Sequence, residues 1–286
     1  MKHLNLDHLN RFLDISLKED HSSKDITSAI LFNRYKRAKS IIISKEKGIL
    51  SGSFIIPLIL KKVKWKISCS NLVKDGNQIF NNSKIAELDG DLRGILAVER
   101  LILNILGHLS GIASLTGKYV KAVSGTRSRI LDTRKTKPGL RELEKYAVRC
   151  GGGYNHRYNL EDMVLVKDNH IASTSFDGLK RACDYWKKHN MPIEIEVDSI
   201  NLLKKVIKLN PDIIMLDNFD CKKIKTAIKF INHYNKNNKI KKVLTEVSGN
   251  VNIKNIRSIA KLGVDRISVG AITHSAPHLD FSLEIL

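Results

Sequence analysis

Apolar and polar positions follow one pattern in residues 1–100 and another in the rest of the chain. Residues 3–18 carry apolar side chains at helical spacing, which predicts a short amphipathic helix. Turn signals then separate four short β-type runs, at residues 37–46, 48–52, 65–70 and 84–88. This part is predicted to form a small α+β domain.

The rest of the chain alternates between strand and helix patterns. Residues 91–124 have the apolar spacing of a buried helix. Six short runs rich in β-branched residues follow, at 129–133, 163–167, 193–197, 213–217, 243–247 and 266–271. Helical patterns lie between most of them, including 199–210 and 251–263. This alternation predicts a parallel sheet with right-handed crossovers, and six units favour a closed or nearly closed barrel.

Polar residues end nearly every one of these six runs. The endings are Thr133-Arg134-Lys135, Lys167-Asp168, Glu196 to Asp198, Asp217-Asn218, Glu246 to Ser248 and Gly270 to Thr273. A β/α barrel carries its active site at the carboxyl ends of its strands. The repeated polar endings therefore predict one shared pocket.

The residue types in this pocket indicate its ligand. Arginine binds planar carboxylates and phosphates with a two-pronged fork, and lysine supplies a compact positive charge. Two carboxylates on successive strands, Glu196 and Asp217, suit Mg²⁺ held together with a phosphorylated substrate. The loop Ser248-Gly249-Asn250 between a strand and a helix suits a phosphate. Together they predict a ligand with carboxylates, a diphosphate and a terminal phosphate.

Composition narrows the cellular setting. No apolar run approaches the roughly 20 residues of a membrane span. Asp7, Asp14 and Glu19 interrupt the first 20 residues, which lack the apolar stretch of a signal peptide. The four cysteines form no CxxC pair, so they are read as free thiols in a reducing compartment. We expect a soluble cytoplasmic protein without a membrane partner.

The charge leaves a second class of function open. The chain of 286 residues carries 49 Lys and Arg against 29 Asp and Glu, a formal net charge of +20. Such a balance favours anionic partners, among them nucleic acid and small phosphorylated substrates. Aromatic residues make up only 6% and no motif for stacking on bases is visible. We expect no nucleic-acid partner, and retention on heparin or DNA as salt rises would test that expectation.

Long motifs resemble one enzyme family. Residues 131–170, LDTRKTKPGLRELEKYAVRCGGGYNHRYNLEDMVLVKDNH, closely resemble the quinolinate phosphoribosyltransferases, also called carboxylating nicotinate-nucleotide pyrophosphorylases. Further blocks follow the family order at residues 16–27, 97–116, 193–199, 213–218, 246–251 and 269–283. The combination of TRKT, GGGxNHR and KDNH is far more specific than a short pattern.

The resemblance implies both a fold and a reaction. The fold is an N-terminal α+β sandwich-like domain over residues 1–100 and an incomplete β/α barrel over 101–274, with residues 275–286 packing back on the first domain. The reaction joins quinolinate to phosphoribosyl pyrophosphate with Mg²⁺, giving nicotinate mononucleotide, CO₂ and pyrophosphate for NAD synthesis. The family forms homodimers, which associate further in some members.

The resemblance also implies roles for individual residues. Lys135, Lys167, Glu196 and Asp217 are the expected catalytic residues, and the two carboxylates are also expected near Mg²⁺, directly or through water. Arg100 corresponds to the arginine that reaches the partner's active site. The quinolinate site is expected to include Thr133, Arg134, Lys135, His156, Arg157 and Lys167, and the ribose and phosphate site Glu196, Asp217, Ser248, Gly249, Asn250, Val269, Gly270 and Ala271.

Two other transferases of related type remain as alternatives. One is the molybdenum-operon protein that shares this fold, and the other is a nicotinate-specific transferase. Neither alternative explains the full set of TRKT, NHR and KDNH cations as well as a dicarboxylate does. Two positions depart from the commonest family pattern, His108 in GHLSG and Asn250 in EVSGN.

Overall fold

The computed structural model describes residues 4–238 and 241–286, which fall into two compact units. Unit 1 contains the residues up to Gly117 together with Thr136–Gly152 and Ile272–Leu286. Unit 2 contains Lys118–Lys135 and Gly153–Ala271. Most of the predicted pocket residues therefore belong to unit 2, whereas Arg100 belongs to unit 1.

Unit 1 is built on a four-stranded antiparallel sheet with the order β12-β1-β5-β3. The strands are β1 (Arg37–Ser44), β3 (Ile67–Ser70), β5 (Lys84–Asp91) and β12 (Phe281–Ile285). Strand β12 pairs with β1 from Ser40 to Ser44, so the C-terminal segment completes a sheet begun near the N-terminus. A small ribbon joins β2 (Gly48–Ile49) to β4 (Gln78–Ile79). The helices of this unit are α1 (Leu6–Glu19), α2 (Ile26–Leu31), α3 (Ile56–Lys62) and α5 (Arg141–Cys150).

The long helix α4 (Leu92–Ala122) is largely buried. By length and composition alone it could cross a membrane, but 67% of its most apolar window is buried inside the protein. Its glycines Gly107 and Gly111 face the C-terminal segment, where a Cβ would lie 1.8 Å from His278 and 1.9 Å from the Pro277 carbonyl oxygen. At Gly111 the neighbour is backbone, so this position has room only for glycine, whereas at Gly107 the neighbour is the exposed ring of His278. The Gly107 carbonyl accepts the N–H of Leu279.

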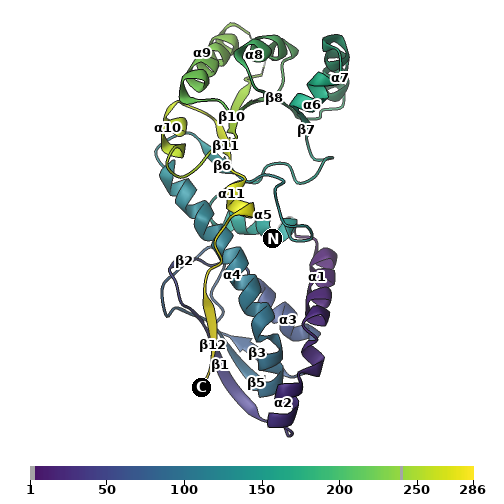
Figure 1. Ribbon diagram of the computed structural model, residues 1–286, viewed down its shortest axis with the longest axis vertical. Coiled ribbons are helices and arrows are strands. Elements are labelled where there is room, and N and C mark those ends of the chain that lie inside the picture. Colours follow the sequence, from purple (N-terminus) through teal and green to yellow (C-terminus); the bar gives the residue numbers. More distant parts are fainter. Residues whose placement is uncertain (1–3, 239–240) are drawn as a thin grey trace. The chain divides into compact units, whose positions relative to one another are not determined.

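Unit 2 contains a six-stranded parallel sheet with the order β6-β11-β10-β9-β8-β7 (Figure 1). The strands are β6 (Arg129–Leu131), β7 (Val164–Val166), β8 (Ile193–Val197), β9 (Ile213–Asp217), β10 (Leu244–Ser248) and β11 (Arg266–Ser268). The helices are α6 (Asp168–Ala172), α7 (Phe176–Lys188), α8 (Ile200–Val206), α9 (Cys221–Asn237) and α10 (Ile256–Lys261), and α11 (Ala271–His274) begins where the unit ends.

The two edge strands of this sheet, β6 and β7, are not paired with each other. The segment between them partly fills the gap, because Tyr154 forms a parallel bridge with Leu131 and its N–H donates to the Ile130 carbonyl. The sheet is therefore an incomplete barrel, and the predicted fold class is confirmed. The sequence-based boundary at residue 100 differs from the grouping into units, because α4 continues without a break across it.

Candidate functional site

The carboxyl ends of the parallel strands bring the predicted polar residues of unit 2 to one edge of the sheet. Asp217 at the end of β9 is in register with Ser248 at the end of β10. Ser268 at the end of β11 is in register with Leu131, which precedes the TRK segment. Thr133, Arg134 and Lys135 follow β6 directly, and Lys167 follows β7. Because all strands run in the same direction, these endings line a common rim.

Local hydrogen bonds shape the two lysine segments. The Thr133 hydroxyl accepts the Lys135 N–H at 3.0 Å and so closes a tight turn after β6. The Lys167 N–H donates to Nδ1 of His170 at 2.9 Å, which caps the short helix α6. Both lysine residues are exposed to solvent, so a ligand at the rim can approach their charges.

Glu196 and Asp217 form a pair of half-buried carboxylates. Burial raises the pKa of Glu196, and the charge of Asp217 raises it further, while Lys167 opposes the shift. Burial likewise raises the pKa of Asp217, which a hydrogen bond from Asn218 and the charges of Lys167 and Lys135 counteract. Two carboxylates that disfavour each other's charge, with lysines nearby, can share a cation or a developing positive charge.

The loop after β10 has a backbone that only certain residues adopt. Gly249 and Asn250 both have left-handed φ values, +79° and +52°. A Cβ on Gly249 would lie 2.2 Å from Oδ1 of Asn218, so this position has no space for a side chain. Asn250 donates to the same oxygen at 3.0 Å, and Asn218 donates to Asp217 at 2.7 Å. Asn250, which departs from the commonest family pattern, therefore connects the predicted phosphate loop to the Asp217 carboxylate through Asn218.

The segment Val269-Gly270-Ala271 follows β11 at the same rim. Val269 is buried and its N–H donates to the Leu131 carbonyl at 2.9 Å. Gly270 and Ala271 are half-buried, and helix α11 starts at Ala271. This segment is thereby anchored next to the turn that carries Thr133.

The NHR segment is held by a fully buried carboxylate, Asp132. Its two oxygens accept the His156 N–H at 2.9 Å and the Asn155 side-chain amide at 2.5 Å. Arg157, 8% exposed, donates from Nη1 to the Met163 carbonyl at 3.1 Å. Burial lowers the pKa of Arg157, and the charge of Arg134 lowers it further.

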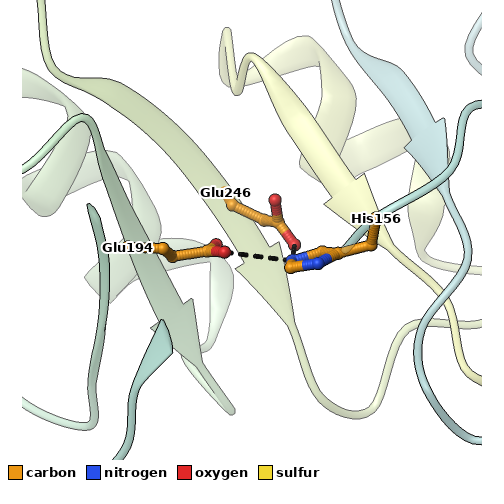
Figure 2. Close-up of side chains that lie close together, drawn as sticks. All are labelled: His156, Glu194 and Glu246. Atoms are coloured by element: carbon orange, nitrogen blue, oxygen red, sulfur yellow. Dashed lines mark ion pairs between the residues drawn. The ribbon is translucent and has the colours of Figure 1, made fainter. Parts of the chain in front are cut away.

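Two carboxylates approach the same nitrogen of the His156 ring (Figure 2). Its Nε2 is 3.0 Å from Oε2 of Glu194 and 3.3 Å from Oε1 of Glu246, and both glutamates are fully buried. Arg266 binds the other oxygen of Glu246 at 2.6 Å. Burial lowers the pKa of His156, but the two nearby glutamate carboxylates outweigh this effect and raise it to about 9.

The same environment shifts the pKa values of the two glutamates in opposite directions. Burial and the charge of Glu246 raise the pKa of Glu194, with His156 opposing the shift. Burial also acts on Glu246, but His156 and Arg266 outweigh it and lower its pKa. Glu246 is therefore the more strongly ionised member of the pair.

Arg100 belongs to unit 1, not to the unit that carries the residues described above. It is an exposed residue of α4 and lines a cavity of about 510 Å³ with Asn104, His108 and Lys137. His108, the other departure from the common pattern, lies 2.9 Å from the fully buried Glu144. Apolar side chains line most of this cavity, together with the cations Arg100 and Lys137 and the carboxylates Glu19 and Asp20.

Sequence reasoning missed the polar interior of the barrel. Glu194 precedes Glu196 by two residues, so both lie on the same face of β8. This spacing was the available sign that Glu194 also faces the inside of the barrel. Glu246 was noted only as a strand ending. Asp132 and Asn218 adjoin predicted residues and support them through hydrogen bonds.

Comparison with known proteins identifies close relatives over nearly the whole chain. Residues 25–110 and 112–284 match the families described as Quinolinate phosphoribosyl transferase, N-terminal domain and C-terminal domain. A protein of Methanocaldococcus jannaschii, described as a probable carboxylating nicotinate-nucleotide pyrophosphorylase, is 40% identical over 285 residues, 98% of each chain. The solved nicotinate-nucleotide pyrophosphorylase of Francisella tularensis has a TM-score of 0.89 and 39% identity, and the alignment covers 99% of this chain and 98% of the other. The solved nicotinate-nucleotide pyrophosphorylase of Ehrlichia chaffeensis has a TM-score of 0.90 and 37% identity. The alignment covers 99% of this chain and 100% of the other.

Proposed function

The chain belongs to the quinolinate phosphoribosyltransferase family, and from this premise we propose that the rim of the unit 2 barrel carries out the family's reaction. The enzyme transfers the phosphoribosyl group of phosphoribosyl pyrophosphate to quinolinate and releases CO₂ and pyrophosphate. The product, nicotinate mononucleotide, enters NAD biosynthesis. The observation that supports this assignment best is the gathering of three cations (Arg134, Lys135 and Lys167) and two carboxylates (Glu196 and Asp217) at one end of the sheet.

The cations match the charge of quinolinate. The substrate carries two carboxylates on one pyridine ring, and the protein supplies two guanidinium groups, Arg134 and Arg157, of which the first lowers the pKa of the second. Guanidinium groups bind carboxylates with two parallel hydrogen bonds. In this proposal both arginines bind the ring carboxylates, together with Thr133, His156 and Lys167.

The carboxylates match the charge that develops on the sugar. As pyrophosphate leaves C1 of the ribose, positive charge builds on the sugar ring, and Glu196 and Asp217 stabilise it. The pyridine nitrogen then attacks C1 and becomes quaternary. As CO₂ departs, the electron pair of the broken C–C bond stays on the ring carbon, where the adjacent positive nitrogen stabilises it, and this carbon then takes up a proton.

Mg²⁺ is the proposed cofactor. The donor set fits it, because Glu196 and Asp217 offer hard oxygen ligands whose mutual repulsion a divalent cation relieves. When bound, the ion neutralises charge on the diphosphate leaving group. Lys135 and Lys167 contribute to the same neutralisation, since both charges are felt at Asp217.

The loop Ser248-Gly249-Asn250 and the segment Val269-Gly270-Ala271 are the proposed phosphate site. Replacing Gly249 with alanine is expected to raise the KM for phosphoribosyl pyrophosphate at least about threefold, since the new Cβ would displace Asn218. Gly125→Ala is the matched control, because Gly125 has a similar φ of +75° but no atom within 4 Å of the point that a Cβ would occupy. Steady-state kinetics of both variants measures the effect, and equal KM values would contradict this phosphate site.

Arg100 is proposed to complete the active site of the partner in a homodimer. Its exposure on α4, on the wall of a partly cationic cavity, supports this role. Arg100→Ala and Lys167→Ala enzymes are each expected to have low activity. Mixing them under conditions of subunit exchange should restore about a quarter of wild-type activity, since half of the dimers are hybrids with one intact site. No recovery after verified exchange would contradict a shared site.

The proposed function also bears on the location and the partners of the protein. We propose a cytoplasmic enzyme, a location that the four free thiols Cys69, Cys150, Cys183 and Cys221 support. Neither a membrane nor a nucleic acid is among the proposed partners. Higher assemblies of the dimer are left to direct measurement of mass in solution.

The activity is tested by product formation. Purified enzyme with quinolinate, phosphoribosyl pyrophosphate and Mg²⁺ is expected to form nicotinate mononucleotide, followed by chromatography. Nicotinate serves as the parallel substrate and is expected to give no product. Absence of product from folded dimer would favour the molybdenum-operon type of transferase instead.

A further inference from the structure

Three residues of unit 1, His108, Lys137 and Glu144, contact one another in a closed ring. Oε2 of Glu144 accepts the backbone N–H of Lys137 at 3.2 Å, and Oε1 lies 2.9 Å from Nε2 of His108. Nδ1 of His108 lies 3.4 Å from Nζ of Lys137. Glu144 is fully buried and Lys137 is exposed, so the ring runs from the interior of the unit to its surface. The reaction described above uses none of these three residues.

The chemistry of the three groups gives each contact its direction. A lysine ammonium group has donors only, so Nδ1 of His108 accepts from Lys137. The ring proton is then on Nε2, where the carboxylate of Glu144 accepts it. An exposed lysine ordinarily samples many rotamers, and holding it in one costs conformational entropy. A histidine and a buried carboxylate that hold an exposed ammonium group therefore indicate a use for its charge.

Lys137 lines the same cavity of about 510 Å³ as Arg100. Arg100, Asn104 and His108 follow one another at intervals of four residues along α4, so they lie on one face of that helix. His108 lies two turns beyond Arg100, about 12 Å along the helix axis. The contact with His108 therefore places the ammonium group of Lys137 on the side of α4 that carries Arg100.

Both cations of this cavity remain available to a ligand. Glu19 and Asp20 line the cavity from the C-terminal end of α1. In the part of the chain that the structure describes, neither of these carboxylates forms an ion pair with Arg100 or Lys137. An anionic group that enters the cavity can therefore bind both positive charges, and both proposed substrates carry such groups.

We propose that His108 and Glu144 are positioning residues that hold the ammonium group of Lys137, and that this charge acts together with Arg100 in the active site of the partner protomer. Arginine binds an anion with its planar fork, and lysine adds a compact positive charge. The inference rests on the proposed function, in which Arg100 completes the partner's site. The alternative is that Lys137 serves its own protomer, since it follows the proposed catalytic residue Lys135 by two positions.

The test begins with the kinetics of Lys137→Ala. This variant is expected to lower kcat/KM for quinolinate at least about fivefold. Lys61→Ala is the matched control, because Lys61 is an exposed lysine of the same unit, in the last turn of α3, and does not line this cavity. Its kcat/KM is expected to stay within about twofold of wild type.

Subunit exchange then separates the two alternatives. Mixing Lys137→Ala with Lys167→Ala is expected to raise activity by up to about a quarter of the wild-type value, because half of the dimers are hybrids with one intact site. Mixing Lys137→Ala with Arg100→Ala is expected to raise nothing, because every site of a hybrid then lacks one of the two cations from its partner. If Lys137 served its own protomer, the two outcomes would be reversed.

The positioning role is tested by a double-mutant cycle. His108→Phe is expected to lower kcat/KM at least about threefold. His108→Phe/Lys137→Ala is expected to stay within about twofold of Lys137→Ala, because both changes act through one ammonium group. A merely structural effect of His108 would instead multiply with the loss of Lys137. His108→Gln replaces His108→Phe if that variant does not fold.

A second readout of this role does not depend on activity. ¹⁵N NMR of the imidazole rings gives the protonated nitrogen of His108, assigned by the loss of its resonances in the His108 variant. Wild-type His108 is expected to carry its proton on Nε2, and its Nδ1 resonance is expected to move in Lys137→Ala.

Four results would overturn the proposal: wild-type kinetics of Lys137→Ala, the reversed or an absent pattern of recovery after verified exchange, multiplied losses in the double variant, or a proton on Nδ1 of wild-type His108. Mixing Arg100→Ala with Lys167→Ala in parallel shows separately whether the shared site proposed for Arg100 fails, and the mixture with Lys167→Ala then decides for Lys137 alone. If wild type converts no quinolinate, the proposed function fails and the NMR readout decides. An Nδ1 resonance that moves in Lys137→Ala would still support the positioning contact, and an unmoved one would overturn it.

Discussion

Replacing Lys135 or Lys167 with alanine is expected to lower kcat/KM for quinolinate at least about tenfold, which corresponds to roughly 1.4 kcal/mol of lost transition-state stabilisation. Both lysines follow strand ends at the rim of the barrel, and both charges act on the carboxylate of Asp217. A diphosphate that leaves the sugar develops negative charge, which a nearby ammonium group stabilises. Steady-state kinetics with saturating Mg²⁺ measures the loss.

The control for these variants is Lys205→Ala. Lys205 is exposed in the last turn of α8, so its replacement removes the same charge at a position outside the rim. Its kcat/KM is expected to stay within about twofold of wild type. Kinetics like those of wild type in both Lys135→Ala and Lys167→Ala would remove these residues from the catalytic site.

Replacing Glu246 with alanine is expected to lower the free energy of unfolding by about 3–5 kcal/mol. The carboxylate is fully buried, and it is bound by Arg266 at 2.6 Å and by His156 at 3.3 Å. Its loss leaves the guanidinium of Arg266 without this partner in a medium that solvates charge poorly. Denaturant unfolding followed by circular dichroism measures the change.

Glu161→Ala is the control for stability, because Glu161 is exposed in the loop before β7. It is expected to change the free energy of unfolding by no more than about 0.5 kcal/mol. If Glu246→Ala and Glu161→Ala unfold at the same denaturant concentration, the contacts of Glu246 with His156 and Arg266 contribute little to stability.

Much of the fold was predictable because strand and helix periods are local properties of the chain. The runs at 193–197 and 213–217 coincide with β8 and β9, and 91–124 contains α4. The pattern at 251–263 gave a helix only from Ile256 to Lys261, because the preceding segment turns through hydrogen bonds of Asn252 and Asn255. Residue 3 of the predicted first helix lies outside the described residues.

Long-range features were less accessible. The antiparallel pairing of β12 with β1 joins segments at opposite ends of the sequence. The family resemblance indicated that residues 275–286 pack on the first domain, but nothing local in either segment specifies the strand partner. The rim residues could be proposed from polar strand endings, and their roles stay predictions. Glu194 was overlooked because a glutamate within a run such as IEIEV gives no sign of whether it faces water or the inside of a barrel.

The same pairing has a consequence for synthesis on the ribosome. Strand β1 emerges early, but one of its two edges stays open until residues 281–285 have been translated. The parallel strands of unit 2 can form in the meantime, so the unit that begins first is the last to be completed. Nascent chains stalled before residue 281 should therefore expose an unpaired β edge to chaperones and to other nascent chains.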